Sequence, residues 1–383
     1  MDLAYTPAEQ AFRAEVRQWL ADHVPARPLP DFDSTREGFE AHRGWERTLH
    51  ADGWGMVTWP AEYGGRGLDL IRWLIFEEEY YRAGAPLRVN QNGIFLLGPT
   101  LIEYGTPEQK ARFLPAMAAG DEIWAQAWSE PGAGSDLAAV RSTAVRDGDD
   151  YVLSGHKIWS SRAVHADWAF GLFRAPGSER HKELSLILFP LDAPGVTVKP
   201  IRRLDGKSVF AEIFLDEVRV PAANRLGDEG QGWAVCMSTA GFERGLMLRS
   251  PARFQVAAAK LVDLWRRRGA DPLLGTAVMQ AWMDADAYAL SIYATASRLM
   301  AGGAIGPETS TNKIFWSELD LDIHKTALSI LGAEAELTDF GASADLGDWL
   351  DGYIFSLAGP IYAGANEIQR NIIAERMLGM PRG

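Results

Sequence analysis

The spacing of apolar residues changes twice along the chain and predicts three regions. In residues 1–120 apolar residues recur every three or four positions, and Phe12, Val16 and Leu20 fall on one face of a predicted helix. The run TPAE at residues 6–9 is a capping box with proline at the first helical position, so it marks the start of that helix. We therefore expect a mostly helical N-terminal domain.

Residues 121–230 follow a different pattern, made of short runs rich in β-branched and aromatic residues. Examples are YVLSGHKIWSS, ELSLILFPLD and SVFAEIFLDEVRV, and Gly, Pro and Asp separate such runs. The spacing is typical of a small β domain. Because the strands are confined to the middle of the chain, alternating βαβ units are not expected.

The helical period returns in residues 231–383 and persists almost to the end. Four long stretches predict a C-terminal helical bundle, and the first of them is expected to kink or split near Gly245 or Pro251. Helical, β and helical regions in this order indicate an α+β protein with three domains, 1–120, 121–230 and 231–383.

Composition narrows the function classes. The 38 Lys and Arg against 51 Asp and Glu give 38 − 51 = −13, which argues against a nucleic-acid-binding protein. The single cysteine, Cys236, excludes an intrachain disulfide. No run approaches the roughly 20 apolar residues of a membrane helix, and MDLAYTPAEQAFRAEV lacks the pattern of a signal peptide. We expect a cytoplasmic protein without a membrane span.

Several common active sites have no sequence signature here. The seven histidines show no HxH or HExxH spacing, so no metal site is expected. G-x-S-x-G, the Walker A loop and G-x-G-x-x-G after a strand are also missing. The chain therefore does not read as a metalloenzyme, a serine hydrolase or a Rossmann protein.

Two runs carry the strongest candidates. WAQAWSEPGAGSDLA, residues 124–138, has glycines whose backbone N–H groups can cradle a pyrophosphate or the polar edge of a ring. The alternative is a glycine-rich hairpin turn. In GHKIWSS, Trp159 can lie on a flat aromatic system while Ser161 hydrogen-bonds its heteroatoms; taken alone, such a tryptophan is more often a core residue.

Five ordered runs together resemble the acyl-CoA dehydrogenase family. They are WPAEYGGRGLD, EYGTPEQKARFLPAMAAGD, AWSEPGAGSD, GHKIWSS and IYAGANEIQRNIIAERMLGMPR, and they cover nearly the whole chain in the family's order. The resemblance implies a helical domain, a central β domain and a C-terminal four-helix bundle. It also implies an FAD-dependent enzyme that removes two hydrogens from the α and β carbons of an acyl-CoA thioester to give the trans-2-enoyl-CoA.

The resemblance implies site residues one by one. The matched cofactor-binding positions are Trp128, Ser129, Gly134, Ser135, Trp159 and Ser161. In the family, Trp128 and Ser129 match residues at the flavin ring, the first through its backbone. Ser135 matches a residue at the pyrophosphate that also borders the substrate, and Ser161 stands near flavin N5, where Thr is commoner.

The reaction needs a carboxylate that takes the α proton. Many family members carry it in a C-terminal Y-E-G-T run, which here reads Tyr362-Ala363-Gly364-Ala365 and holds no acid. Isovaleryl- and long-chain-type members carry a glutamate before an arginine on the first bundle helix, and Glu243-Arg244 matches that position. We predict Glu243 as the base and Arg244 as a substrate-binding residue; the alternative is a pair of solvated helix charges. Ala363 would then leave room for a branched or bulky acyl group.

Two runs with which homotetrameric relatives complete a neighbour's FAD site are altered. R-x-x-F-G becomes RRRGADPL and Q-x-x-G-G becomes SILGAEAEL, with Ser329 and Ala333 at the changed positions. One reading, slightly favoured by the sequence, is a homotetramer in which Arg266, Arg267 or Arg268 still meets FAD phosphate. The other is the base-bearing chain of a heterotetramer, as in relatives that act on steroid side chains.

Other activities remain open within the same family. Some members are flavin monooxygenases or oxidases, but Glu243-Arg244 and Ser135 favour dehydrogenation. By resemblance the electron acceptor is an electron-transfer flavoprotein. The acyl group, and whether coenzyme A or a carrier protein bears it, are not encoded in any run that we can identify.

Overall fold

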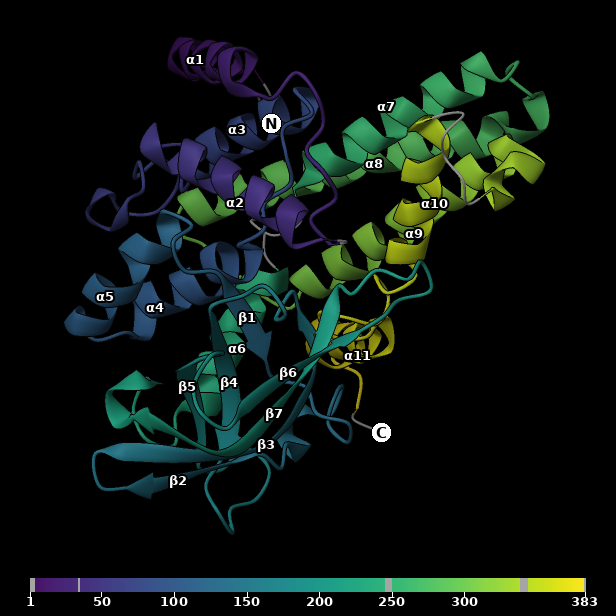
Figure 1. The fold of residues 1–383 in the computed structure, drawn as a ribbon. Coiled ribbons are helices and arrows are strands. Elements are labelled where there is room, and N and C mark those ends of the chain that lie inside the picture. Colours follow the sequence, from purple (N-terminus) through teal and green to yellow (C-terminus); the bar gives the residue numbers. More distant parts are fainter. Residues whose placement is uncertain (1–3, 34, 245–249, 338–343, 382–383) are drawn as a thin grey trace. The chain divides into compact units, whose positions relative to one another are not determined.

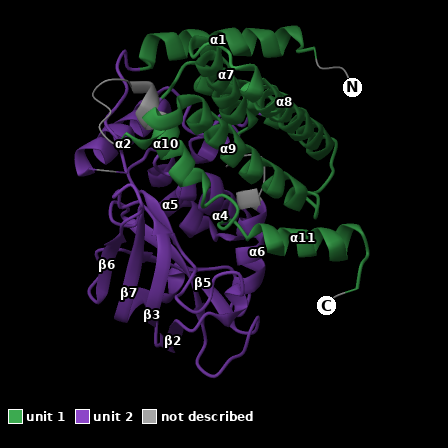
Figure 2. Cartoon of the chain, turned by 90° about the vertical axis from the view of Figure 1, so that its right-hand side faces the viewer, with its two compact units in different colours: residues 1–24, 69–85, 244–383 green, residues 25–68, 86–243 purple. Residues whose placement is uncertain are grey.

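The computed structural model describes residues 4–33, 35–244, 250–337 and 344–381 (Figure 1). The side chains of residues 242–244 and 344–348 are not part of that description. The chain forms two compact units (Figure 2). Unit 1 comprises Met1–Val24, Asp69–Ala85 and Arg244–Gly383, and unit 2 comprises Pro25–Leu68 and Pro86–Glu243. Each unit is built from segments that are far apart in the sequence.

Unit 1 is helical. Its helices are α1 (Pro7–His23), α3 (Leu70–Arg82), α7 (Pro251–Arg267), α8 (Pro272–Met300), α9 (Thr309–Leu331), α10 (Ala344–Ser356) and α11 (Asn366–Ile372), with a 3₁₀ turn at Gly332–Glu336 and a π-helical turn at Ile373–Met377. Helices α7, α8 and α9 pack against one another, α10 and α11 pack on α9, and α3 packs on α1, α7 and α8. Helical packing of this kind is the expected bundle, with two N-terminal helices added to it.

The predicted start of α1 is confirmed in atomic detail. The Thr6 backbone N–H donates to Glu9 Oε2 at 2.7 Å, and the Glu9 N–H donates to Thr6 Oγ1 at 3.3 Å. Phe12, Val16 and Leu20 are all buried. The expected break near Pro251 is also found between α6 (Gly232–Arg244) and α7, because Ser250 has a non-helical ψ of 131° and Pro251 takes the first position of α7.

Unit 2 combines helices with one sheet. Its helical segments are α2 (Arg36–Ala51), α4 (Gly98–Tyr104), α5 (Pro107–Ala118), the π-helical Asn92–Leu97, short 3₁₀ turns at Ala61–Tyr63, Leu137–Ala139 and Ala222–Asn224, and α6 apart from its last residue. The strands are β1 (Trp124–Ala127), β2 (Thr143–Asp147), β3 (Asp150–Ser161), β4 (Trp168–Arg174), β5 (Leu184–Pro190), β6 (Val196–Ile201), β7 (Phe210–Pro221) and β8 (Arg225–Leu226).

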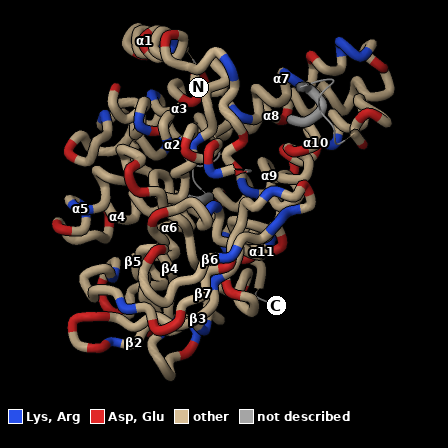
Figure 3. The backbone as a smooth tube through the Cα atoms, viewed as in Figure 1, with Lys and Arg blue, Asp and Glu red and all other residues tan. Residues whose placement is uncertain are grey.

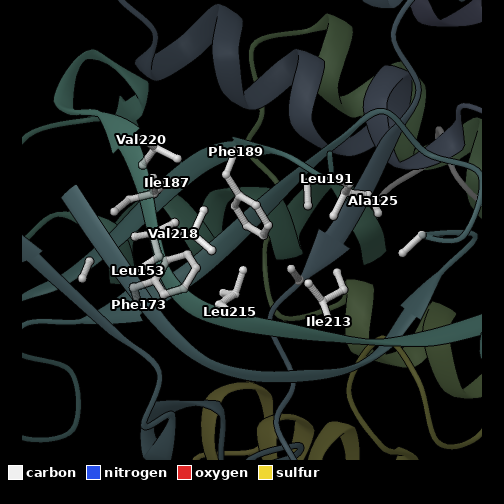
Figure 4. Packing of buried hydrophobic residues seen from close by; sticks show 14 of the residues in the cluster. Ala125, Leu153, Phe173, Ile187, Phe189, Leu191, Ile213, Leu215, Val218 and Val220 are labelled. Carbon is white, nitrogen blue, oxygen red and sulfur yellow. The ribbon is translucent and has the colours of Figure 1, made fainter. Parts of the chain in front are cut away.

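The sheet has the order β6-β7-β3-β2-β4-β5-β8, and β1 pairs with β4 in parallel. Apart from the β1–β4 and β2–β4 pairings, the described neighbours are antiparallel. Alternate residues of these strands, among them Leu153, Phe173, Ile187, Phe189 and Ile213, form a buried cluster (Figure 4). This is the small β domain that the short β-rich runs predict.

Charge is distributed over both units. Figure 3 shows acidic and basic residues interspersed along the chain. In the part of the chain that the structure describes, no helix combines the length and apolar character needed to cross a bilayer. Across the same described residues, no group of three or more His, Cys, Asp or Glu side chains is arranged to hold a metal ion.

Helix α6 begins in close contact with β5, and this contact gives a stability prediction. A Cβ on Gly232 would lie 2.5 Å from the backbone C and O of Leu184 and from the N of Ser185. Because backbone atoms cannot yield as a side chain can, we expect Gly232→Ala to lower the free energy of unfolding by about 1–3 kcal/mol, measured by urea denaturation.

Gly241 on the same helix is the matched control. A Cβ there would meet no atom within 4 Å outside the helix's own backbone. Gly241→Ala should therefore raise stability by about 0.5–1 kcal/mol, since alanine restricts the unfolded chain and favours a helix. If both substitutions changed the free energy of unfolding equally, the close approach of α6 to β5 would not require glycine at position 232.

Candidate active site

The first candidate run forms a tight turn that opens onto exposed backbone. Glu130 and Ala133 exchange two backbone hydrogen bonds, with N–O distances of 2.9 and 3.0 Å. The hairpin turn considered as an alternative is therefore present. Beyond it, Gly134 and Ser135 are exposed, and a Cβ on Gly132 or Gly134 would meet no atom within 4 Å. The turn thus presents free backbone beside open space.

Trp159 is not a core residue. It is 56% exposed, and its φ of +63° lies in the left-handed region that non-glycine residues seldom adopt. The register of β3 against β7 shifts between Lys157 and Ser160, which explains the irregular backbone at this point. Its indole meets the Phe210 ring edge-on, with centroids 6.0 Å apart. A strained residue that exposes a large flat ring is a common feature of ligand sites.

The two runs are neighbours in unit 2. The backbone N–H of Ile158 donates to Ser129 O at 2.9 Å. In the described part of the chain, Trp128 Nε1 and Ser160 Oγ are buried without a hydrogen-bond partner, and Ser161 is partly exposed at the end of β3. An exposed indole, hydroxyls and open backbone suit a flat cofactor with polar edges, and so they fit the FAD that the resemblance implies.

A buried ion pair joins the two runs, and neither of its residues was among the sequence candidates. Lys157 Nζ donates to Glu130 Oε1 at 2.7 Å, and Lys157 is fully buried. Burial opposes ionisation of Glu130, but the Lys157 charge and the hydrogen bonds from Ser142 and Arg141 outweigh it and lower the pKa of Glu130. The sequence did contain a signal for this pair, because Glu130 and Lys157 are charged residues within two runs rich in apolar and small residues.

The nominated base belongs to α6. The backbone of Glu243 and Arg244 is helical and forms the last described turn of α6. Their side chains lie outside the described part of the structure, so the prediction of Glu243 as base and Arg244 as substrate contact stays a prediction. The close approach of Gly232 to β5 fixes where this helix begins.

The C-terminal run without an acid forms a tight corner in unit 1. Ala363 and Gly364 both have positive φ, +57° and +83°. The ring of Tyr362 stacks on Trp316 with centroids 5.9 Å apart. Lys313 Nζ donates to Gly359 O at 2.9 Å and to Asn366 Oδ1 at 2.6 Å, so both ends of the corner are held by one residue. The corner is a half-buried run of small residues with no carboxylate of its own.

The two altered runs of unit 1 are joined to each other. Arg268 donates from both terminal nitrogens to the two oxygens of Glu334, at 2.8 and 2.7 Å. This bond from Arg268 lowers the pKa of Glu334, so the carboxylate is charged. Arg266 and Arg267 line a separate hollow of about 640 Å³ together with Lys260. One arginine of the first run, Arg268, is therefore ion-paired with an acid of the second run, Glu334.

Family models cover most of the chain. The N-terminal, middle and C-terminal domain models of acyl-CoA dehydrogenase match residues 6–121, 125–218 and 230–378. The chain thus has the family's architecture of a helical N-terminal, a β middle and a helical C-terminal domain.

Curated relatives and solved structures agree with these models. The chain is 42% identical to acyl-CoA dehydrogenase IpdE1 of Mycolicibacterium smegmatis, covering 97% of this chain and 98% of the relative. It is 32% identical to acyl-CoA dehydrogenase FadE26 of Mycobacterium tuberculosis, over 100% and 99% of the two chains.

Among solved structures it resembles the Tcur3481-Tcur3483 steroid ACAD, with a TM-score of 0.86 and 30% identity over the full length of both chains. It also resembles the ChsE4-ChsE5 complex from Mycobacterium tuberculosis, with a TM-score of 0.84 and 32% identity, again over both full lengths. The chain belongs to the acyl-CoA dehydrogenase family, whose members are FAD-dependent oxidoreductases that act on the CH–CH group of an acyl-CoA.

Proposed function

We propose that this chain dehydrogenates an acyl-CoA thioester with a bulky acyl group, with Glu243 as the base that takes the α proton. FAD, when bound, accepts the hydride that leaves the β carbon. The observation that carries the proposal is the half-exposed, left-handed Trp159 beside the open Ser129–Ser135 turn. This surface suits a flat ring system such as the flavin. The proposed reaction is the one that members of the family catalyse.

The roles of the other residues follow from their chemistry. The backbone and hydroxyl groups of Trp128, Ser129 and Ser161 would hydrogen-bond the ring edge. Gly134 and Ser135 would bind the pyrophosphate through the exposed backbone of the turn. Arg244 would steady the carboxylate or the thioester. An electron-transfer flavoprotein in the cytoplasm would then reoxidise the enzyme, as in other family members.

We further propose that the working enzyme contains a second, related chain. The Arg268–Glu334 pair supports this, because it sets a carboxylate in the run with which homotetrameric relatives approach a neighbour's FAD. Because its guanidinium already holds both oxygens of Glu334, Arg268 is engaged within its own chain and does not reach a phosphate of a neighbour's FAD. The ChsE4-ChsE5 complex is an assembly of two differently named chains, and it is similar to this chain along its full length. The homotetramer is the alternative.

A face of α8 supports association in either case. Met279, Trp282, Met283 and Leu290 are exposed and share one face of this helix of unit 1. Monomeric proteins rarely leave such a row of large apolar side chains in water. A partner helix with an apolar face would remove it from water.

The bulky acyl group is proposed from the Ala363 corner. A methyl group replaces the carboxylate that many relatives carry there, and Lys313 hydrogen-bonds to both ends of the corner. One similar structure is described as a steroid ACAD. We therefore propose a branched or ring-bearing acyl chain for this enzyme also.

The test is an anaerobic titration of the yellow enzyme with a panel of acyl-CoAs. We expect ring-bearing or α-branched thioesters to bleach the flavin band within the turnover time and straight medium chains to do so poorly. Bleaching by straight chains alone would contradict the bulky-substrate proposal. Formation of hydrogen peroxide in air at each turnover would instead indicate an oxidase.

A further inference from the structure

Lys157 of β3 uses every donor of its ammonium group inside unit 2. Its Nζ donates to Leu172 O at 2.5 Å, to Glu130 Oε1 at 2.7 Å and to Trp128 O at 3.4 Å. The side chain is fully buried. Because a lysine ammonium has three N–H groups, each acceptor receives one.

Glu130 links the start of the turn to the residues that follow it. Its Oε2 accepts from the Arg141 N–H at 2.6 Å, and its Oε1 accepts from the Ser142 N–H at 2.9 Å. Its own backbone is paired with Ala133. The loop that contains Ser129, Gly134 and Ser135 is therefore closed at both ends around one carboxylate.

The same short stretch of β3 fixes the peptide groups on both sides of Ser129. Trp128 O accepts from the Lys157 side chain, and Ser129 O accepts from the Ile158 backbone. The next residue along β3 is Trp159, which turns outward with a positive φ. Any rotation of the Ser129 peptide thus acts on the strand that presents the indole.

We propose that Lys157 is a positioning residue of the cofactor site, which sets the Trp128–Glu130 backbone in register with Trp159. The inference rests on the proposed function, because it takes these residues as the FAD site. Lys157 acts through the backbone it holds and does not touch the cofactor. Its role is to keep the N–H and carbonyl groups of the turn in one orientation before FAD arrives.

Energetics favour positioning over stability as the role of this pair. Replacing a buried ion pair by apolar residues of similar volume often leaves stability unchanged or raises it, whereas removal of one partner is strongly destabilising. The Lys157 ammonium also lies 5.0 Å from the centre of the Phe173 ring, in surroundings where a methionine would pack. What methionine cannot do is donate to Trp128 O.

The experiment compares Lys157→Met, Glu130→Gln and the double variant in the full chain, together with its partner chain where FAD loading needs one. Urea denaturation reports stability. Fluorescence titration reports the Kd for FAD, and the visible spectrum at saturating FAD reports the surroundings of the ring. We expect the double variant to recover part of the stability that either single variant loses, because no unpaired charge remains buried. The rest stays lost, because the amide has one acceptor oxygen where the carboxylate offers two to the Arg141 and Ser142 N–H groups. We expect the double variant still to bind FAD at least about tenfold more weakly, with shifted flavin bands.

Arg88 and Glu46 form the matched control pair. Both are buried in unit 2, with Arg88 Nε donating to Glu46 Oε2 at 2.6 Å. The double variant Arg88→Met/Glu46→Gln should leave the Kd for FAD and the flavin bands unchanged. Recovery of wild-type FAD affinity and spectrum by Glu130→Gln/Lys157→Met would overturn the proposal, as would an equal loss of affinity in the control. FAD binding is measured without acyl-CoA, so the result does not depend on which thioester the enzyme oxidises.

Discussion

Glu243→Gln should slow flavin bleaching by the best acyl-CoA at least about 100-fold, because a positioned general base contributes about 10²–10⁴-fold. Glutamine has nearly the same shape and keeps one acceptor oxygen, but its amide cannot accept the α proton. The FAD content and the urea midpoint should stay at wild-type values. Anaerobic stopped-flow absorbance at the flavin maximum measures the rate.

Glu367→Gln is the matched control for this substitution. Glu367 is an exposed acid in the first turn of α11, three residues after the tight corner. It is the nearest acid to the missing family glutamate along the chain, so it is the obvious competitor for the role of base. Bleaching by Glu367→Gln should stay within about twofold of wild type, as expected for a solvated charge. A fast Glu243→Gln with a slow Glu367→Gln would reverse the assignment.

Local signals were sufficient for much of the fold. The capping box at Thr6 was predictable because both of its hydrogen bonds join residues three positions apart. The strands β3, β5 and β7 follow from short runs rich in β-branched and aromatic residues, a signal that needs no knowledge of the partner strand. Local patterns do not show which elements pack against each other. The periodicity of α3 shows an apolar face but not that α7 and α8 cover it.

The candidate site shows the same division. The turn and the indole were proposed as site elements from residue types, yet the left-handed backbone of Trp159 depends on a register shift between β3 and β7. Lysine is usually exposed, so the burial of Lys157 depends on Glu130, 27 residues away. Likewise, the partner of Arg268 lies 66 residues further along the chain. Contacts of this kind follow from the fold rather than from a motif.

Purified without a partner, the folded chain should retain far less than one FAD per polypeptide after desalting. In the proposed enzyme the second chain supplies the R-x-x-F-G and Q-x-x-G-G contacts that the Arg268–Glu334 region of this chain does not offer. Loss of contacts worth about 4 kcal/mol weakens binding about 1,000-fold. Co-expression with a related chain that carries both runs should give a yellow complex with one FAD per pair, measured by absorbance after release of the cofactor.

Arginine variants of the complex separate the two assemblies. If the second chain completes the site, Arg266→Ala and Arg268→Ala in this chain should leave the FAD content within about twofold, because neither side chain reaches the cofactor. In a homotetramer the same arginines would meet the phosphates of a neighbour's FAD, and charge-assisted hydrogen bonds of this kind contribute about 1.5–3 kcal/mol each. Stoichiometric FAD in the lone chain, with a clear loss in either variant, would therefore establish the homotetramer and exclude the second chain.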